Sequence, residues 1–287
     1  MSRITRAEVM TKSISDRLVI KFILYALLIF FASLLMVPFF WMLSSSLKHD
    51  LEVFTIPIRW LPSDPVWENY LRIWTRIPLA TFLKNTAFLT IVVTVLQLLT
   101  SSFAAYAFSK LHFPGRNILF LAYVGTIAIP WQTYMVPQFI MFRAVGLVDT
   151  HMSIIILQAF TAFGVFLIKQ FYDTVPNELI EAARIDGMGE YRIWARIMLP
   201  LSKPALATLT IFTFVTTWND FLGPRLYLTS QRLWTIQIGM RMFIGQHATE
   251  FGLIMAIATV SVIPILIVFL ALQKFFVQGI ATSGIKG

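Results

Sequence analysis

Long apolar stretches separated by short polar segments dominate the hydropathy pattern of this chain. Six of them approach the roughly 20 residues that a helix needs to cross the hydrocarbon core of a bilayer. They cover residues 18–44, 86–108, 117–139, 152–172, 205–222 and 252–277. Pro130 and Pro137 interrupt the third stretch, so we expect a kink or an early end near Pro130. The pattern predicts an all-α membrane protein with six transmembrane helices.

Composition supports a membrane protein and excludes several kinds of chemical site. Hydrophobic residues make up 57% of the chain and charged residues 13%, about half the charged fraction of a soluble domain. The first apolar run follows four basic residues, but it is too long for a cleaved signal peptide, so we expect a retained anchor. The absence of cysteine excludes disulfides, thiolate metal sites and cysteine nucleophiles. The four histidines lie in separate loops without ligand spacing, and we expect no metal site.

The distribution of basic residues predicts the orientation in the membrane. With six spans, both termini lie on one side, and 14 Lys and Arg residues fall on that side against eight on the other. The positive-inside rule therefore places both termini in the cytoplasm. It also makes residues 173–203 a cytoplasmic loop, which we call the charged loop. The chain then consists of a cytoplasmic segment 1–17, a six-helix transmembrane domain 18–277 and a cytoplasmic tail 278–287. Because membrane topology accounts for the basic residues, nucleic-acid binding is not needed to explain the positive net charge.

The charged loop contains signals for two short helices. Thr174 is a suitable N-cap, and Pro176 falls in the first turn, where its missing N–H is harmless. Gly187 is suited to end this helix. A second helix is expected to begin at Gly189–Glu190 and to stop at Pro200.

Side chains in the first of these helices favour contact with another protein. Glu181 and Arg184 are three residues apart and are expected to pair across one turn. Ala182 and Ala183 between them allow another surface to approach closely. These features alone leave three alternatives open: a docking element, a solvated connection between two spans, and an amphipathic segment lying on the membrane.

The spacing of residues in the charged loop resembles a known motif. Glu181-Ala182-Ala183, three residues, Gly187, nine residues, and then Ile197-x-Leu199-Pro200 is similar to the "EAA" loop in permease subunits of bacterial ABC importers. In that family the loop forms a coupling helix that inserts into a cleft of a cytoplasmic ATPase. The resemblance therefore assigns ATPase coupling to the matching residues and to the adjacent acid: Glu181, Ala182, Ala183, Asp186, Gly187, Ile197, Leu199 and Pro200.

The end of the chain narrows the resemblance to carbohydrate permeases. Residues 275–287 resemble the tail of permeases similar to the smaller membrane subunit of the maltose transporter, and Trp218-Asn219-Asp220-Phe221 is also typical of that branch. The resemblance implies the type I importer permease fold in the bacterial inner membrane. It also implies a second, related permease, two ATPase subunits and an extracytoplasmic binding protein as partners. It assigns a tail contact with the ATPases to Gln278, Gly279, Gly284 and Lys286.

The sequence contains no Gly-x-x-x-x-Gly-Lys-[Ser/Thr] phosphate loop, so we expect this chain to hydrolyse no ATP by that mechanism. It also lacks the motifs of common hydrolases. The chain is therefore expected not to be an enzyme and to bind no cofactor. ATP and Mg²⁺ are expected on the partner ATPase.

Polar residues within the spans are candidates for a substrate path, although they also join neighbouring helices. The leading candidates are Gln158, Thr161, Trp218 and Asn219, and Gln97, Gln132, Asp220, Tyr134 and Phe160 are further ones. Basic residues within the spans are scarce, which favours a neutral sugar or oligosaccharide as cargo. A polyol or glycerol phosphate importer is the alternative. An ion-coupled secondary carrier is less favoured, because the spans show neither mid-membrane carboxylates nor inverted repeats.

Overall fold

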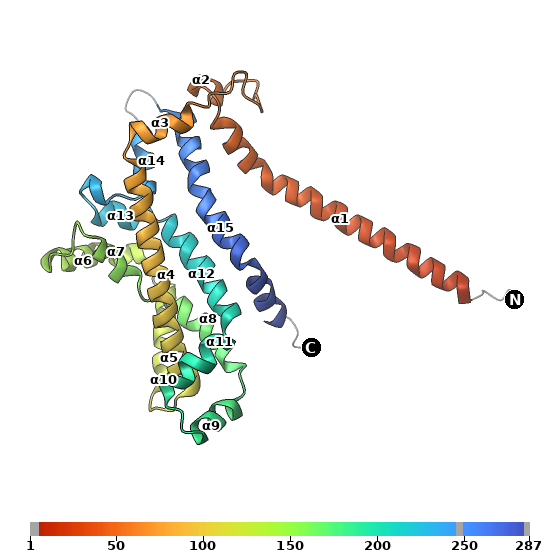
Figure 1. Cartoon of the computed structure of the whole chain (residues 1–287), viewed down its shortest axis with the longest axis vertical. Helices are drawn as coiled ribbons and strands as arrows, with labels where there is room; N and C mark the ends of the chain where they lie inside the picture. Colours follow the sequence, from red (N-terminus) through yellow and green to blue (C-terminus); the bar gives the residue numbers. More distant parts are fainter. Residues whose placement is uncertain (1–5, 245–248, 284–287) are drawn as a thin grey trace. The chain divides into compact units, whose positions relative to one another are not determined.

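The computed structural model describes residues 6–244 and 249–283, and it contains no β-strand within these ranges. The chain divides into two compact units. The first comprises Met1–Tyr70 with Glu250–Thr259, and the second comprises Leu71–Thr249 with Val260–Gly287. Figure 1 shows the helices in chain order.

The first unit contains two helices and a loop region. They are α1 (Arg6–Ser45) and α2 (Asp50–Val53), and the start of α15 (Phe251–Ser283) also belongs to this unit. The Asn69 side-chain amide donates to the carbonyls of Ser46 at 2.9 Å and Lys48 at 3.2 Å. The N–H of Gly252 donates to Asp50 Oδ1 at 2.8 Å. These bonds connect the end of α1, the loop after it and the beginning of α15.

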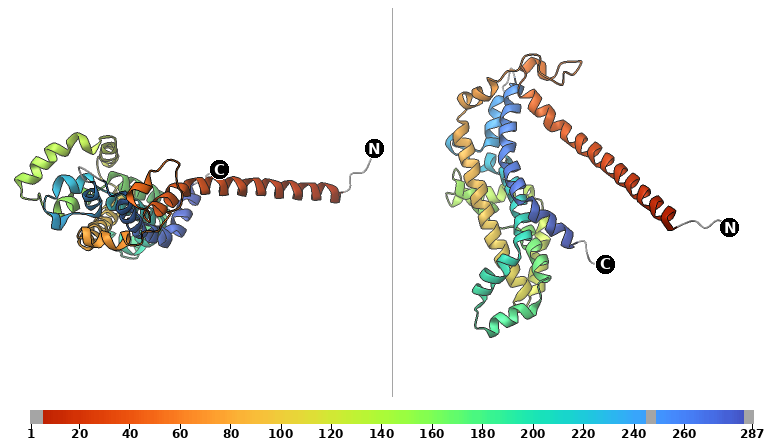
Figure 2. Two further views of the ribbon diagram at one scale, coloured as in Figure 1. Left: turned by 90° about the horizontal axis from the view of Figure 1, so that it is seen from above. Right: turned by 45° about the vertical axis from the view of Figure 1, so that its right-hand side comes forward.

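The second unit is built around α4, a helix of 32 residues. Its elements are α3 (Asn69–Arg76, which begins in the first unit), α4 (Leu79–Lys110), α5 (Arg116–Gly125), η1 (Thr126–Ala128), α6 (Trp131–Ala144), α7 (His151–Gln158), α8 (Ala162–Asp173), α9 (Asn177–Ile185), α10 (Glu190–Ile193), η2 (Trp194–Met198), α11 (Leu199–Leu201), α12 (Lys203–Trp218), α13 (Leu222–Tyr227), η3 (Gln231–Leu233), α14 (Ile236–Met240), η4 (Arg241–Phe243) and the rest of α15. Helices α4, α8 and α12 pack along one another. Figure 2 shows α4 and α12 side by side.

Close packing of these three helices depends on a glycine. A Cβ on Gly164 in α8 would lie 2.4 Å from Ser101 Oγ in α4 and 3.1 Å from Leu209 Cδ2 in α12. Small residues at helix contacts let backbones approach closely inside a membrane. Gly164 therefore sets the spacing of the bundle that carries the functional surfaces.

Four of the helical segments can cross a membrane by length and composition within the described residues. They are Val19–Ser45, Leu79–Lys110, His151–Asp173 and Phe251–Phe275. Two bent pairs raise the number to six if each is one span: Arg116–Ala128 with Trp131–Ala144, and Glu190–Leu201 with Lys203–Trp218. The interruption predicted near Pro130 is confirmed, because the first pair bends there by 99°. The other pair bends by 79°.

Several predicted boundaries need correction. The fourth stretch, predicted as one helix, is broken between Gln158 and Ala162 into α7 and α8. The fifth helix ends at Trp218 rather than at 222, because a turn at Asn219 and Asp220 leads into α13. The final helix continues to Ser283, so its helical backbone extends into the segment predicted as a separate tail.

Candidate functional site: the charged loop and a polar cavity

The first helix of the charged loop, α9, ends in a hydrogen-bonded glycine turn. Gly187 has a φ of +79°, in the left-handed region that favours glycine. Its N–H donates to the Arg184 carbonyl at 3.0 Å, and the N–H of Met188 donates to the Ala183 carbonyl at 2.9 Å. These are the two bonds of a Schellman motif. The predicted helix end at Gly187 is confirmed.

Other local predictions for the charged loop were wrong. Pro176 is the N-cap of α9, while the Thr174 hydroxyl donates backward to the Phe171 carbonyl at 2.7 Å. The second helix does not stop at Pro200 but continues to Leu201, through the π-turn η2. A wider turn before a proline relieves the clash of its ring with the carbonyl four residues earlier.

Helix α9 has one face buried in the protein and one face exposed. Ile180 and Ala183 are buried in a cluster with side chains of α4, α8, α10, η2 and α12. Ala182 is exposed, and the Ile185 side chain is 85% exposed. Of the two predicted alanines, Ala182 alone is free to meet another surface directly. Ala183 contributes by holding the helix in place.

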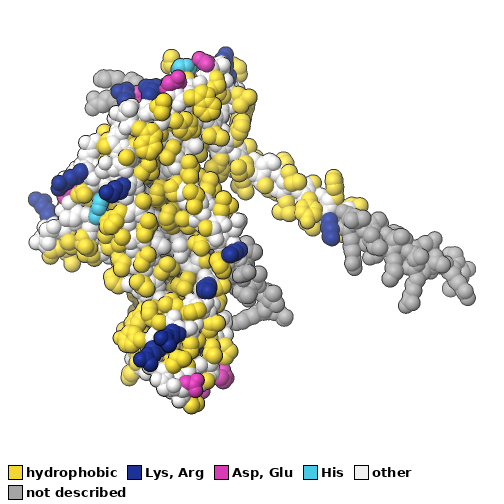
Figure 3. All heavy atoms as spheres, in the orientation of Figure 1, with side chains coloured by type: hydrophobic (Ala, Val, Ile, Leu, Met, Phe, Trp, Pro, Cys, Tyr) yellow, Lys and Arg dark blue, Asp and Glu magenta, His cyan; other side chains and the backbone are white. Residues whose placement is uncertain are grey.

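The remaining residues of the motif divide in the same way. Glu181, Asp186 and Gly187 are exposed on the outer side of α9. Ile197 is partly buried against the same cluster as Ala183, whereas Leu199 is half-buried and Pro200 is exposed. Charged side chains gather around the tip of the second unit that carries α9 (Figure 3).

Polar side chains of α4 hold both ends of α9. Lys110 Nζ donates to the Val175 carbonyl at 2.7 Å and to Asn177 Oδ1 at 2.8 Å, at the beginning of α9. At its other end, Arg184 pairs with Glu190 at 2.8 Å, and the Tyr106 hydroxyl donates to the same carboxylate. The predicted Glu181–Arg184 pair was wrong, because the chain turns back at Gly187 and brings Glu190 to Arg184.

Aromatic rings add a third contact between α4 and the charged loop. The Phe103 ring in α4 stacks on Tyr191 with centroids 5.6 Å apart, and it meets the Trp194 ring edge-on at 5.3 Å. Such pairs contribute about 0.5–1.5 kcal/mol beyond the area they bury. The charged loop is therefore joined to α4 by hydrogen bonds, an ion-paired carboxylate and ring packing together.

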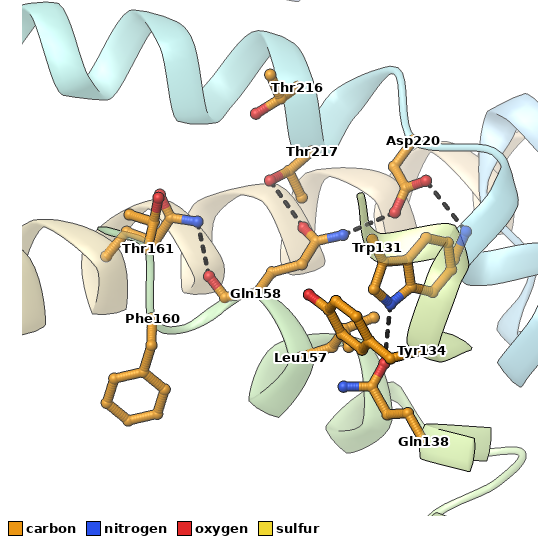
Figure 4. A pocket seen from close by; sticks show the side chains of 12 residues that line it. Trp131, Tyr134, Gln138, Leu157, Gln158, Phe160, Thr161, Thr216, Thr217 and Asp220 are labelled. Carbon is orange, nitrogen blue, oxygen red and sulfur yellow. Dashed lines mark hydrogen bonds between the residues drawn. The ribbon is translucent and has the colours of Figure 1, made fainter. Parts of the chain in front are cut away.

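The second candidate site is a cavity of about 410 Å³ between α4, α6, α7 and α12 (Figure 4). Its lining combines amides, hydroxyls, aromatic rings and one carboxylate: Gln97, Trp131, Tyr134, Gln138, Leu157, Gln158, Phe160, Thr161, Thr216, Thr217, Asp220 and Gly223. A concave pocket with aromatic walls and a few oriented polar groups is typical of a small-molecule site.

Hydrogen bonds from α4 stabilise the helix break beside this cavity. Gln97 Nε2 donates to the Gln158 carbonyl at 2.6 Å, and the Thr100 hydroxyl donates to the Ala159 carbonyl at 2.8 Å. Backbone groups freed by a broken helix within a membrane must find such partners. The side chain of Gln158 is thereby held at the cavity wall.

The side chain of Gln158 also connects to α12. Its Nε2 donates to Asp220 Oδ2 at 2.7 Å, and its Oε1 accepts from the Thr217 hydroxyl at 3.0 Å. The other Asp220 oxygen accepts from the Gly223 N–H at 3.1 Å. These groups are thus oriented before any ligand arrives.

The structure brings together only part of the predicted substrate path. Gln158 and Thr161 line the cavity. Trp218 does not line it, since it is buried, stacks on Phe214 and donates to Ser261 Oγ at 3.0 Å. Asn219 also lies outside the lining, and its Oδ1 accepts from Gln237 at 3.3 Å. Of the further candidates, Gln97, Asp220, Tyr134 and Phe160 line the cavity, and Gln132 does not.

Sequence reasoning missed six residues of the lining: Trp131, Gln138, Leu157, Thr216, Thr217 and Gly223. Trp131 and Gln138 are seven residues apart, which places them on one face of α6, where Trp131 Nε1 donates to Gln138 Oε1 at 2.8 Å. That i, i+7 spacing is the sequence signal that could have found them.

The residues predicted to contact the ATPases from the C-terminal tail are described only in part. Gln278 and Gly279 lie in the helical backbone of α15, and Gly284 and Lys286 lie outside the described residues. Within residues 6–244 and 249–283, no group of three His, Cys, Asp or Glu side chains is placed to hold a metal ion.

Comparisons with known proteins agree on one family. Residues 14–282 match the family described as "Binding-protein-dependent transport system inner membrane component". The chain is 34% identical to the arabinooligosaccharides transport system permease protein AraQ of Halalkalibacterium halodurans, over 79% of this chain and 81% of that protein. It is 33% identical to the melibiose/raffinose/stachyose import permease protein MelC of Bacillus subtilis, over 88% and 91%.

Two further matches extend the range of cargo among these relatives. The chain is 30% identical to the sn-glycerol-3-phosphate transport system permease protein UgpE of Yersinia enterocolitica, over 90% of this chain and 95% of that protein. Among solved structures, it is similar to a chain in the crystal structure of a bacterial ABC transporter involved in the import of the acidic polysaccharide alginate. The TM-score is 0.78 at 26% identity, over 96% of this chain and all of that one.

Proposed function

The chain belongs to the binding-protein-dependent transport system inner membrane component family, and we propose that it forms half of the translocation path of an ATP-driven importer for a sugar or oligosaccharide. An extracytoplasmic binding protein delivers the cargo, and a second, related permease supplies the other half of the path. Relatives named for arabinooligosaccharides and for melibiose, raffinose and stachyose support a carbohydrate cargo. The chain is a permease subunit and not an enzyme.

In this proposal the chain crosses the inner membrane six times. The two bent helix pairs each supply one span, the second through its Lys203–Trp218 helix, which brings the number of candidate spans from four to six. Both termini and the charged loop then lie in the cytoplasm, on the side with more Lys and Arg. Exposed apolar side chains along α1 suit contact with lipid or with the second permease.

Helix α9 is the proposed coupling element, and the division between its two faces carries this assignment. Its inner face is fixed to α4 and its neighbours, while Ala182 and Ile185 are exposed. An exposed isoleucine next to a small residue suits a cleft on another protein. Two ATPase subunits, which hold the ATP and Mg²⁺, would supply that cleft. The C-terminal tail is a second proposed contact with them.

The coupling works as a population shift. ATP binding favours the closed arrangement of the ATPase pair, and α9 links that arrangement to one conformation of the membrane helices. The free energy of nucleotide binding thereby changes the balance between inward-open and outward-open states. Helix α4 contacts the beginning of α9 directly and its end through Glu190 of α10, so it would be the first membrane helix to respond.

Uptake by variants of the complete transporter tests this function. We expect Glu181→Lys and Gly187→Asp to abolish ATP-driven sugar uptake while membrane insertion persists. Asp64→Lys, in an exposed loop of the first unit, is the charge control and should transport normally. Unchanged uptake in both charged-loop variants would overturn the coupling assignment. Uptake without ATP or partner subunits would instead indicate a secondary carrier.

Glycerol phosphate is the second candidate cargo, because a relative named for sn-glycerol-3-phosphate covers 90% of this chain. A phosphate ester normally requires cationic or N–H-rich surroundings. Within residues 6–244 and 249–283, no Lys, Arg or His lines the cavity at the helix break. The sugar therefore remains the better supported cargo.

A further inference from the structure

The cavity lining includes a carboxylate, that of Asp220, in the turn that follows α12. Gln97, on its wall, lies 13 residues before the end of α4 at Lys110, which is about 20 Å along a helix. Asp220 is connected to Gln97 through Gln158. Asp220 is thereby tied to a cavity wall that lies far from the ends of α4, where an ionisable residue normally faces water or a ligand rather than lipid.

Among the described residues, no cationic side chain lines the cavity to compensate Asp220. Its two oxygens accept from neutral donors, the Gln158 amide and the Gly223 N–H. Lys, Arg and His are all missing from the part of the lining that the structure describes. A single negative charge in a partly desolvated pocket repels anions more strongly than it would in water.

Aromatic rings at the cavity suit the apolar faces of a sugar ring. The Phe160 side chain is 66% exposed and the Tyr134 side chain 43% exposed, although both belong to membrane segments. Trp131 lies beside Tyr134 (Figure 4). Oriented amide, hydroxyl and carboxylate groups next to these rings can bond the hydroxyls of a glycosyl unit.

We propose that this cavity is a subsite for one neutral glycosyl unit in transit, and that Asp220 makes the path selective against anionic cargo. Gln158 and Asp220 bond sugar hydroxyls, while the aromatic rings cover a face of the sugar. This proposal rests on the proposed function and adds a specificity-determining residue to it. It separates this chain from importers of glycerol phosphate or acidic polysaccharide, whose cargo carries negative charge.

The absence of cysteine from the sequence permits a direct test. Thr216→Cys places a thiol in the cavity of the complete transporter, and Thr161→Cys serves as a second position should the first fail to assemble. The rates of modification by a cationic and an anionic methanethiosulfonate are compared. We expect the ratio of the cationic to the anionic modification rate to be about tenfold higher at this cysteine than at free cysteine, as one nearby uncompensated charge implies.

A pair of charge variants identifies the source of that preference. Asp220→Asn should remove it, and Asp64→Asn, which deletes an exposed carboxylate outside the cavity lining, should leave it intact. A preference that survives Asp220→Asn would overturn the role of Asp220. Failure of both reagents at both cysteine positions would show that the cavity faces lipid and would overturn the subsite.

Sugar protection tests the ligand class. Raffinose, maltotriose and arabinotriose are the neutral probes, and trigalacturonate is the anionic probe. We expect the neutral sugar that the complex imports to slow modification at least threefold, and trigalacturonate to have no effect. Import of a neutral probe without protection, or equal protection by trigalacturonate, would contradict the subsite. Absence of ATP-driven uptake of every probe would count against the proposed function, while the charged reagents still test the cavity itself.

Discussion

Arg184, in the last turn of α9, donates from Nε to Oε1 of Glu190, the first residue of α10, at 2.8 Å. The two residues are joined across the Gly187 turn, and Tyr106 of α4 donates to the same carboxylate. An exposed ion pair alone contributes little, about 0–1 kcal/mol. Its importance here is geometric, because it fixes α9 relative to α4.

Breaking this contact should uncouple the loop from the membrane helices. We expect Glu190→Gln to reduce ATP-driven uptake several-fold, because a neutral hydrogen bond is about half as strong as a charge-assisted one. Tyr106→Phe should act in the same direction. Since both changes affect one network, the double variant should lose less than the product of the single effects. Independent, multiplicative losses would contradict a shared network.

Gly187 should be sensitive to substitution and Gly189 should not. Gly187→Ala forces a side chain into the left-handed region, at about 1–2 kcal/mol. Gly189 has a φ of −73° and open space at its Cβ position, so Gly189→Ala is the matched control. Uptake and thermal unfolding of the purified transporter measure the difference. Equal behaviour of the two variants would show that the turn does not position α9.

Gly164→Ala should loosen the α4–α8–α12 bundle. The added methyl group would meet Ser101 and Thr161 side chains at 2.4 and 2.7 Å, and overpacking typically costs about 1–3 kcal/mol. Gly125→Ala, where nothing lies within 4 Å, is the control. We expect a lower unfolding temperature in detergent for the first variant only. An unchanged unfolding temperature for Gly164→Ala would refute the close packing.

Substitution of Gln97 should lower the unfolding temperature more than substitution of Gln132, although both are glutamines in predicted spans. Gln97→Leu leaves the Gln158 carbonyl and the Thr213 hydroxyl without their partner, at about 1–3 kcal/mol. Gln132 is exposed and outside the cavity lining, so Gln132→Leu should be nearly neutral. Thermal unfolding distinguishes the two, and a larger effect at Gln132 would contradict the proposed support of the helix break.

Asp149 should make stability depend on pH under acidic conditions. Hydrogen bonds from the Ser230 hydroxyl and N–H, and from the Thr229 N–H, lower the pKa of this carboxyl to about 2. A carboxyl with a lowered folded-state pKa contributes stability above its unfolded pKa of about 3.9, and this contribution is lost as pH falls toward 2.

Asp149→Asn is the variant that isolates this effect. Asparagine tolerates the positive φ of 62° at this position, so the backbone is not strained. We expect the variant to unfold a few degrees lower than the unchanged protein at pH 7, with the gap closing between about pH 4 and pH 2. A gap that is constant over this range would show that the carboxylate contributes nothing through its charge.

Hydropathy and loop signals predicted the helical segments well but not every interruption within them. Pro130 marked the bend in the third stretch because proline removes a backbone donor. The break after Gln158 had no such mark, since apolar residues flank it and no proline lies within it. It exists because Gln97 and Thr100, some sixty residues earlier, satisfy its carbonyls. Such long-range compensation is invisible in local sequence.

Parts of the candidate sites were likewise not predictable from local sequence. The charged loop was recognised from its spacing, but only the fold shows that Ala183 faces inward and that Arg184 pairs with Glu190. Gln158 and Thr161 were found as polar residues in a span. Trp131 was missed because the kink expected near Pro130 gave no direction for the segment after it, and only the fold shows that the bend carries α6 to the cavity.

The central claim is that α9 passes the ATPase cycle to the membrane helices. The most direct measurement is ATP hydrolysis by the complete transporter in proteoliposomes, with and without sugar-loaded binding protein. We predict that the unchanged transporter is stimulated by the loaded binding protein, and that Glu181→Lys abolishes the stimulation while the complex remains in the membrane. Stimulation of equal size in the Glu181→Lys transporter would contradict the account.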